Sequence, residues 1–271
     1  MKRVSIFWTG GYDSSFRVCQ LSRLNIEIQP YYLSDNRRSE KNELNAIREI
    51  TEFLNALDET KATILPLEYI PKPNRDKDNN ITKSYKTLRK QDFMGSQYEW
   101  LAIFAKNHKG VELSIHKDDK AIQLISKHGA LKEEIDEDIG RYYVIDEKNS
   151  SPDLIRVFKD YHLPLAQYTK KEMKKEYKEN GFDEVIGKTW FCFTPINGKP
   201  CGKCNPCVYT IEEGMKERFD NAALYRYHAK KTKVKIKRSK FLKKHNSIKK
   251  IVIKVIRAVA GLVKKIINVK N

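Results

Sequence analysis

Seven consecutive residues near the start of the chain have the composition of an anion-binding loop. They read Thr9-Gly10-Gly11-Tyr12-Asp13-Ser14-Ser15 and follow a short apolar stretch at 2–8 that predicts a buried strand. Apolar residues at helical spacing begin at Phe16, so a strand is expected to turn through two glycines into a helix. Glycine lets the backbone approach a ligand closely, and the N–H groups and dipole of a helix start favour negative charge. The loop therefore predicts a phosphate-binding site.

The side chains of this loop suggest how a bound phosphate would be used. We expect Asp13 to orient a donor or to help hold Mg²⁺, and Ser14 and Ser15 to donate hydrogen bonds; Asp13 and Ser14 are the predicted catalytic residues. The lysine of a Walker loop and the GxGxxG pattern are both absent, and an ordinary Gly-Gly turn is the alternative. The predicted nucleotide-binding residues are Trp8, Thr9, Gly10, Gly11, Tyr12, Asp13, Ser14, Ser15, Tyr32 and Leu33.

Four cysteines form a second chemical motif. Cys192, Cys201, Cys204 and Cys207 are spaced C-x8-C-x2-C-x2-C, with glycine and proline between them. Four thiolates at this spacing suit tetrahedral Zn²⁺, and such a closed site is structural because no position is left for water. An iron–sulfur cluster would use the same ligands, and reduced core cysteines are a further alternative. Cys19, which lies in the first expected helix, is interpreted as a small buried apolar residue.

The segments between the two motifs predict an α/β fold. Strands are expected at 26–33, 62–70, 111–116 and 142–145, and helices from about 40 to 57, at 93–107 and at 121–125. Alternating strands and helices imply a Rossmann-like parallel sheet covered on both faces, with ligands at the carboxyl ends of the strands. The polar segment 71–91 is expected to be a long loop, either a lid or disordered.

The strand ends supply further candidate residues. The backbone around Tyr32 and Leu33 is a predicted neighbour of an adenine ring, although both tyrosines of the pair at 31–32 could equally be core aromatics. His116 and Asp119 could bind substrate or metal, or could belong to a solvated charged turn. A capping box at 169–172 predicts the start of a helix that runs to about 180 and stops at Gly181.

Length and composition predict three segments in a cytoplasmic protein. We assign 1–165 to an ATP-binding α/β domain, 166–228 to a helical segment with a zinc knuckle, and 229–271 to a basic tail. No apolar run is long enough for a membrane span, and the apolar stretch at the N-terminus is too short for a secretory signal. Cysteines crowded into one motif suit a reducing compartment. The sequence does not determine the oligomeric state, and a homo-oligomer is one of the alternatives.

The net charge of +18 is concentrated in the tail. No acidic residue follows Asp220, whereas 17 lysines and arginines lie between Arg226 and Lys270, so the rest of the chain is nearly neutral. Segment 247–269 places isoleucines and valines on one helical face and basic residues on the other. A basic amphipathic helix is typical of binding to an anionic membrane, so we expect peripheral attachment at the inner face. RNA binding is the less favoured alternative, because the tail has few aromatic residues for stacking on bases.

The two motifs together resemble a known enzyme family. The glycine loop is similar to the SGGxDS loop of the PP-loop ATP pyrophosphatase superfamily, with Thr9 in place of the first serine. Over residues 3–215 the chain resembles the 7-cyano-7-deazaguanine synthase family in the order of its motifs. The matching segments are 35–39 with Glu43, 163–165, 169–173, the Trp190-x-Cys192 pair, and the run Pro200-Cys201-Gly202-Lys203-Cys204-x-x-Cys207.

The resemblance implies a ligase that uses ATP, Mg²⁺ and a structural Zn²⁺. Such an enzyme adenylates a small-molecule carboxylate, releases pyrophosphate, and converts the carboxylate with ammonia to an amide and then a nitrile. At 116–122, however, the chain reads His-Lys-Asp-Asp-Lys-Ala-Ile, where the family carries a Gly-Tyr-Pro-Asp-Cys-Arg run that helps to bind the deazapurine. A divergent ligase or amidotransferase acting on another carboxylate or amide, in surface-glycan or secondary metabolism, is therefore the first alternative. An RNA-binding module without enzymatic activity is the second, and a structural partner protein is the third.

Overall fold

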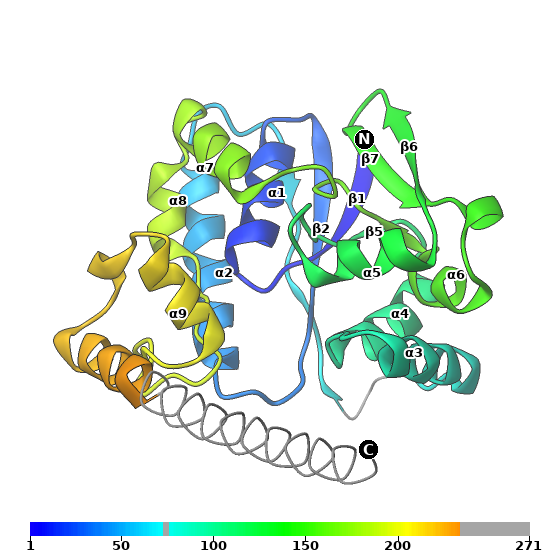
Figure 1. Cartoon of the computed structure of the whole chain (residues 1–271). Coiled ribbons are helices and arrows are strands. Elements are labelled where there is room, and N and C mark those ends of the chain that lie inside the picture. The colour runs from blue at the N-terminus through cyan, green and yellow to red at the C-terminus, as the bar shows by residue number, and fades with distance from the viewer. Residues whose placement is uncertain (73–75, 234–271) are drawn as a thin grey trace, which may run out of the picture. The chain divides into compact units, whose positions relative to one another are not determined.

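The computed structural model describes residues 1–72 and 76–233, and these form two compact units that are divided between residues 198 and 199 (Figure 1). The predicted amphipathic helix at 247–269, with its expected membrane surface, lies outside the described residues. Within the described part, no helix combines the length and apolar character needed to span a bilayer.

The first unit is built on a parallel sheet, which gives it a Rossmann-like α/β fold (Figure 1). The strand order is β3-β2-β1-β5-β8, and β4 continues the pairing of β3 along β2. After β4 the chain returns to the opposite side of β1, so the order reverses between β1 and β5, where ligands bind in open α/β sheets. The strands are β1 Lys2–Phe7, β2 Ile26–Leu33, β3 Thr63–Ile64, β4 Glu68–Ile70, β5 Val111–Glu112 and β8 Tyr161–His162.

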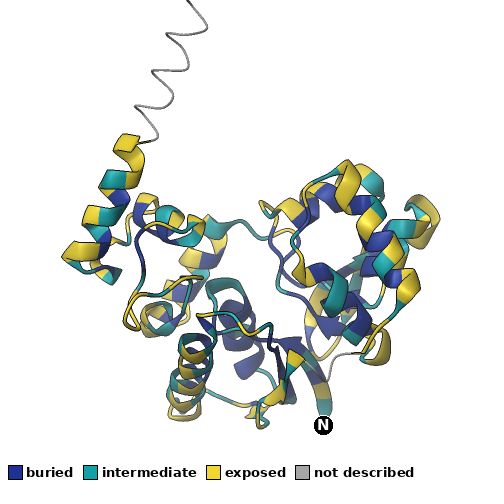
Figure 2. Ribbon diagram, turned by 90° about the horizontal axis from the view of Figure 1, so that it is seen from below, coloured by how far each residue is buried: buried dark blue, intermediate teal, exposed yellow. Residues whose placement is uncertain are grey.

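Alternate residues of the central strands enter two separate cores. In β1, Ile6 belongs to one core and Phe7 to the other; in β2, Tyr32 and Tyr31 divide in the same way. Strands that are covered on both faces carry consecutive apolar residues, and the C-terminal parts of both strands, 6–7 in β1 and 30–33 in β2, are such buried runs. Figure 2 shows this burial on the ribbon, with dark blue strands and helix faces turned towards them.

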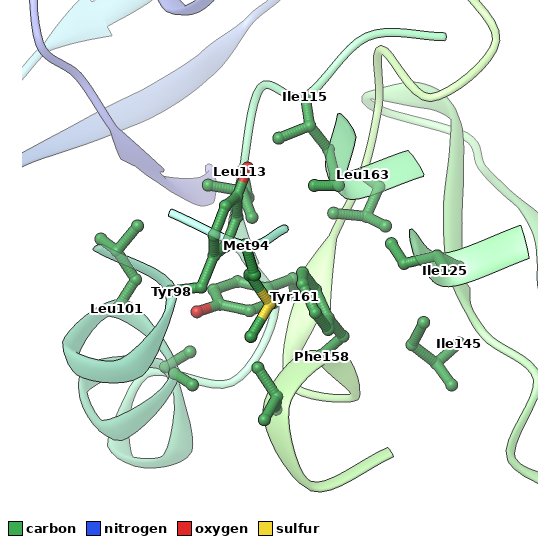
Figure 3. Close-up of a cluster of buried hydrophobic side chains, with 14 of the residues drawn as sticks. Met94, Tyr98, Leu101, Leu113, Ile115, Ile125, Ile145, Phe158, Tyr161 and Leu163 are labelled. Atoms are coloured by element: carbon green, nitrogen blue, oxygen red, sulfur yellow. The ribbon is translucent and has the colours of Figure 1, made fainter. Parts of the chain in front are cut away.

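The helices divide between the two cores. One core contains residues of α1 Tyr12–Ser22, α2 Glu40–Asn55, α7 Lys170–Glu179 and α8 Asp183–Lys188. The other contains residues of α3 Asn79–Gln91, α4 Gln97–Asn107, α5 Lys120–His128 and α6 Pro152–Phe158. Part of this second core is drawn in Figure 3, where Tyr98 and Leu101 of α4 lie beside Tyr161 of β8.

Several sequence predictions are confirmed. The second strand covers 26–33 as expected, and the capping box of α7 is complete, with the Thr169 side chain accepting from the Glu172 backbone and Glu172 accepting in return. Gly181 follows α7 with a φ of 72°. The expected third strand at 62–70 is divided into β3 and β4, and Pro66, which lacks a backbone N–H, lies between them.

The prediction of a long loop at 71–91 is wrong, because α3 occupies its second half. Asp78 caps the helix by accepting from the backbone N–H groups of Asn80 and Ile81. Ile81, Tyr85 and Leu88 then bury one face at helical spacing. The charged and polar residues between these positions make the helical spacing of the apolar residues hard to recognise in the sequence.

The strand predicted at 142–145 is confirmed, but it does not belong to the parallel sheet. These residues lie in β7 Gly140–Ile145, which pairs with β6 Leu131–Asp136 in a separate antiparallel hairpin. Asp136 accepts from two backbone N–H groups of the connecting turn, at Asp138 and Ile139. The edge position in the main sheet belongs instead to β8, whose two residues give too short an apolar run to be recognised.

The second unit contains α9 Asn205–Glu212 and a helical stretch at 221–233. Gly202 has a φ of 73°, and a Cβ added there would lie 2.0 Å from the carbonyl oxygen of Ala223. Arg226 donates to the carbonyl of Cys201 at 2.9 Å. The turn that carries the last three cysteines is therefore packed closely against the helix that follows.

Candidate nucleotide pocket and cysteine cluster

The glycine loop connects β1 to α1 and touches α2. Gly10 has a φ of 65°, and a Cβ added there would lie 2.8 Å from the carbonyl oxygen of Glu43 and 2.9 Å from the Cβ of Ala46. Gly11 is the N-cap of α1 and brings no side chain to the helix start. The backbone is thus exposed to a ligand at the positive end of the helix dipole.

Gly10→Ala is expected to destabilise the chain by about 2 kcal/mol, because alanine is strained at this positive φ and its Cβ would collide with fixed atoms of α2. Gly181→Ala is the matched control: its φ is 72°, but an added Cβ has nothing within 4 Å. Urea unfolding of both variants tests the expectation. Equal losses of stability would show that the contact with α2 has no energetic effect.

A cavity of about 530 Å³ opens beside the loop, at the carboxyl ends of β1, β2 and β5. This volume falls in the usual range for small-molecule sites. The lining residues come from these three strands, from the segments that follow them, from α4, and from Phe193. They are Phe7, Thr9, Gly11, Tyr12, Asp13, Ser14, Tyr31, Leu33, Asp35, Arg37, Gln97, Tyr98, Trp100, Leu101, Leu113, Ser114, Ile115, Asp119 and Phe193.

Six of the ten predicted nucleotide-binding residues line this cavity, namely Thr9, Gly11, Tyr12, Asp13, Ser14 and Leu33. The other four do not. Trp8 and Ser15 are fully buried, and the Trp8 indole donates to the Ser15 hydroxyl at 3.0 Å. Tyr32 points into the core shared with α2, where its hydroxyl donates to Glu43 at 2.7 Å. Gly10, the fourth residue, contacts α2. Of the tyrosine pair at 31–32, it is Tyr31 that lines the cavity.

Lys170 is a site residue that the sequence reading missed. Its ammonium group forms an ion pair with Asp13 and lies 4.6 Å from the centre of the Tyr12 ring. The sequence showed Lys170 only as the first residue of a capped helix. Its partner lies 157 residues earlier in the chain, so no local signal connects the two.

Three further polar groups of the cavity come from segments after β4. Asp119 caps α5 through its bond from Ala121 N–H, and the buried hydroxyl of Ser114 has no hydrogen-bond partner among the described residues. Burial raises the pKa of Tyr98 well above its usual value, and the charges of Asp119 and Asp13 add to the effect. Tyr98 therefore stays protonated and can donate a hydrogen bond. His116, the other candidate of this turn, is not part of the lining: its ring accepts from Asp118 N–H at 3.2 Å.

The segment at 35–43 is fixed by its own polar contacts. Arg37 donates to Asp35 at 2.7 Å and lies 3.6 Å from Glu43. Glu43, which is buried, also accepts from the hydroxyls of Tyr32 and Ser39. The Arg37 guanidinium at the cavity is therefore balanced by two carboxylates.

The four cysteines of the second motif meet at one point. Their sulfur atoms all lie within 4.8 Å of one another, and none is in a disulfide. Backbone N–H groups of Lys203 and Cys204 donate to the Cys201 sulfur at 3.4 and 3.3 Å. Four such ligands fit a metal ion such as Zn²⁺. Cys19 lies in the α1 core, where burial raises the pKa of its thiol.

No protein-family model matches this sequence, and no match is found among curated proteins. The resemblance to the synthase family therefore rests on the motifs and on their order along the chain.

Proposed function

We propose that this chain is an ATP-dependent ligase of the PP-loop type, which activates a carboxylate and releases pyrophosphate. The observation that carries the proposal is the position of Asp13, which stands in the glycine loop and lines the cavity where the strand order reverses. An acidic residue beside a phosphate cradle can hold the Mg²⁺ that accompanies a nucleoside triphosphate. Asp119, which lines the same cavity, is a second candidate ligand.

The proposed phosphate site combines the loop backbone with Lys170. The glycine loop has no lysine of its own, whereas a Walker loop uses one to contact phosphate. Without nucleotide, the Lys170 ammonium neutralises Asp13. With Mg²⁺ bound at the Asp13 carboxylate, Lys170 would be placed to contact the phosphates, where its charge would stabilise the negative charge that develops on the pyrophosphate.

Bound ATP would supply the leaving group that a carboxylate lacks. The carboxylate oxygen attacks the α-phosphorus and expels pyrophosphate, and ammonia then displaces AMP from the activated carbonyl carbon to give an amide. A second activation, at the amide oxygen, would again expel pyrophosphate, and loss of AMP and a proton from the adenylated amide would give a nitrile. The chain's own contribution is to hold both reactants in the cavity and to bind the departing pyrophosphate.

The substrate proposed first is 7-carboxy-7-deazaguanine with ammonia. The different sequence at 116–122 favours a second candidate, a ligase of the same mechanism acting on another carboxylate. Purified zinc-loaded protein is to be tested for Mg²⁺-dependent ATP binding by calorimetry, and then for pyrophosphate release with this substrate and ammonium. Binding without release rejects the first substrate. Absence of Mg²⁺-dependent binding rejects the proposed function.

Asp13→Asn is expected to lower pyrophosphate release about 100-fold, because the neutral amide binds Mg²⁺ poorly and no longer pairs with Lys170. Asp118→Asn is the matched control, since Asp118 is exposed and lies outside the cavity lining. The measurement is the rate of pyrophosphate release at saturating ATP. A rate for Asp13→Asn equal to that of Asp118→Asn would contradict the assigned role.

A further inference from the structure

The segment that carries the first cysteine ligand also contacts the glycine loop. The backbone N–H of Trp190 donates to the carbonyl oxygen of Gly10 at 2.7 Å. The carbonyl oxygen of Trp190 lies 3.7 Å from the point where a Cβ of Gly11 would stand. One residue thus touches both glycines of the predicted phosphate site.

The same segment reaches the metal ligand and the cavity within three residues. The indole N–H of Trp190 donates to the carbonyl oxygen of Cys192 at 2.8 Å, and Phe193 lines the cavity. Residues 189–195 form neither helix nor strand. A segment without regular secondary structure depends on its tertiary contacts for its conformation, and Cys192, which is fully buried in the middle of the segment, provides one of them.

We propose that Trp190 is a positioning residue of the nucleotide site, through which metal binding at Cys192 and nucleotide binding at the glycine loop strengthen each other. The proposal rests on the proposed function, because it requires a nucleotide at the loop. A metal held by Cys192 fixes the segment, the segment holds the Gly10 carbonyl, and the loop keeps the conformation that receives phosphate. Without the metal the segment loses this constraint, and the loop is no longer held in the conformation that receives phosphate.

Coupling between two binding sites is reciprocal, so it can be measured from the metal side. The probes are Zn²⁺, a chromophoric chelator that competes for it, and a non-hydrolysable ATP analogue with excess Mg²⁺ so that the analogue does not bind Zn²⁺. Saturating analogue is expected to raise the Zn²⁺ affinity of the full chain roughly tenfold, within the usual range of such couplings. Calorimetry on the zinc-loaded protein measures analogue binding separately.

Two aromatic variants test the assigned path. Trp190→Phe keeps an aromatic ring and the backbone bond to Gly10 but loses the indole bond to Cys192, so the roughly tenfold effect is expected to fall at least threefold. Tyr69→Phe also removes one side-chain hydrogen bond, the bond to Glu40, but Tyr69 lies outside both the cysteine segment and the cavity lining, so this variant is expected to leave the effect unchanged.

The outcomes of these measurements distinguish a failure of the coupling from a failure of the proposed function. Analogue that binds while the Zn²⁺ affinity stays constant overturns the coupling and leaves the proposed function standing. Analogue that fails to bind the zinc-loaded chain overturns both. Equal loss of coupling in the two variants overturns the role of Trp190, because an effect unrelated to the cysteine segment would then explain the loss.

Discussion

Cys204→Ser is expected to release the metal and to leave a chain that does not fold. Cys204 is the least buried of the four ligands, and its sulfur lies 3.3 Å from that of Cys207. A serine hydroxyl stays protonated at neutral pH and does not replace a thiolate as a zinc ligand. Structural Zn²⁺ sites contribute apparent folding free energy on the order of 10 kcal/mol, which is comparable to the whole stability of a domain.

The measurements are metal content of the purified protein and the yield of folded chain. Cys19→Ser is the control, because it makes the same substitution at a buried cysteine outside the cluster. This control is expected to keep its metal and to lose about 1–3 kcal/mol, since a hydroxyl replaces a thiol in an apolar core. A folded, metal-free Cys204→Ser protein would contradict the structural role of the site.

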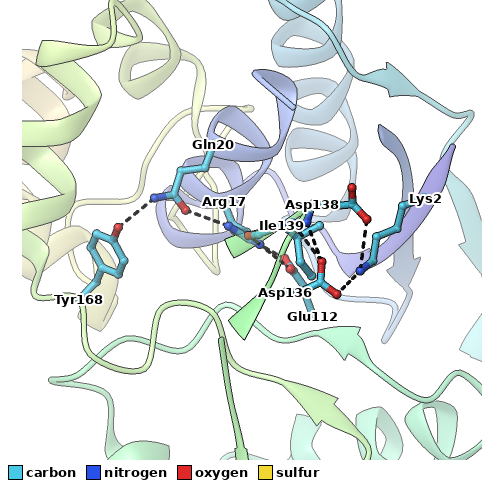
Figure 4. A network of polar contacts seen from close by, with 8 residues as sticks. All are labelled: Lys2, Arg17, Gln20, Glu112, Asp136, Asp138, Ile139 and Tyr168. Carbon is cyan, nitrogen blue, oxygen red and sulfur yellow. Dashed lines mark hydrogen bonds and ion pairs between the residues drawn. The ribbon is translucent and has the colours of Figure 1, made fainter. Parts of the chain in front are cut away.

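Arg17→Met is expected to destabilise the chain by about 3–5 kcal/mol, because it leaves a carboxylate charged and unpaired inside the sheet. Arg17 of α1 donates to Glu112 of β5 through two nitrogens, at 2.8 and 2.7 Å. The two side chains are 6 % and 0 % exposed. Arg17 also donates to the carbonyl of Ile139 in the β6–β7 hairpin at 3.3 Å, so one guanidinium joins three elements (Figure 4).

Urea unfolding measures the effect, and two further variants define its origin. Arg3→Met removes the same kind of side chain from an exposed pair with Glu27 and is expected to cost less than about 1 kcal/mol. The double variant Arg17→Met/Glu112→Leu removes both charges and is expected to recover most of the loss. A cost for Arg17→Met no larger than that for Arg3→Met would contradict the assigned energetics.

The sequence by itself determined the features that depend on local spacing. The strand–Gly-Gly–helix start, the strand at 26–33, the capping box at Thr169 and the four clustered cysteines all follow from residues close together in the chain. Strand periodicity, turn chemistry and metal-ligand spacing act over a few residues, so they can be recognised without knowledge of the fold.

Only the tertiary structure decided which side chains meet in the cavity. Tyr31 and Tyr32 are neighbours in a strand buried on both faces, and a shift of one residue exchanges the face that lines the cavity for the face that packs on α2. The pairing of Asp13 with Lys170 depends on the docking of α7 near the start of α1. These contacts join residues far apart in the chain, and their geometry is fixed by the packing of whole helices and strands rather than by local pattern.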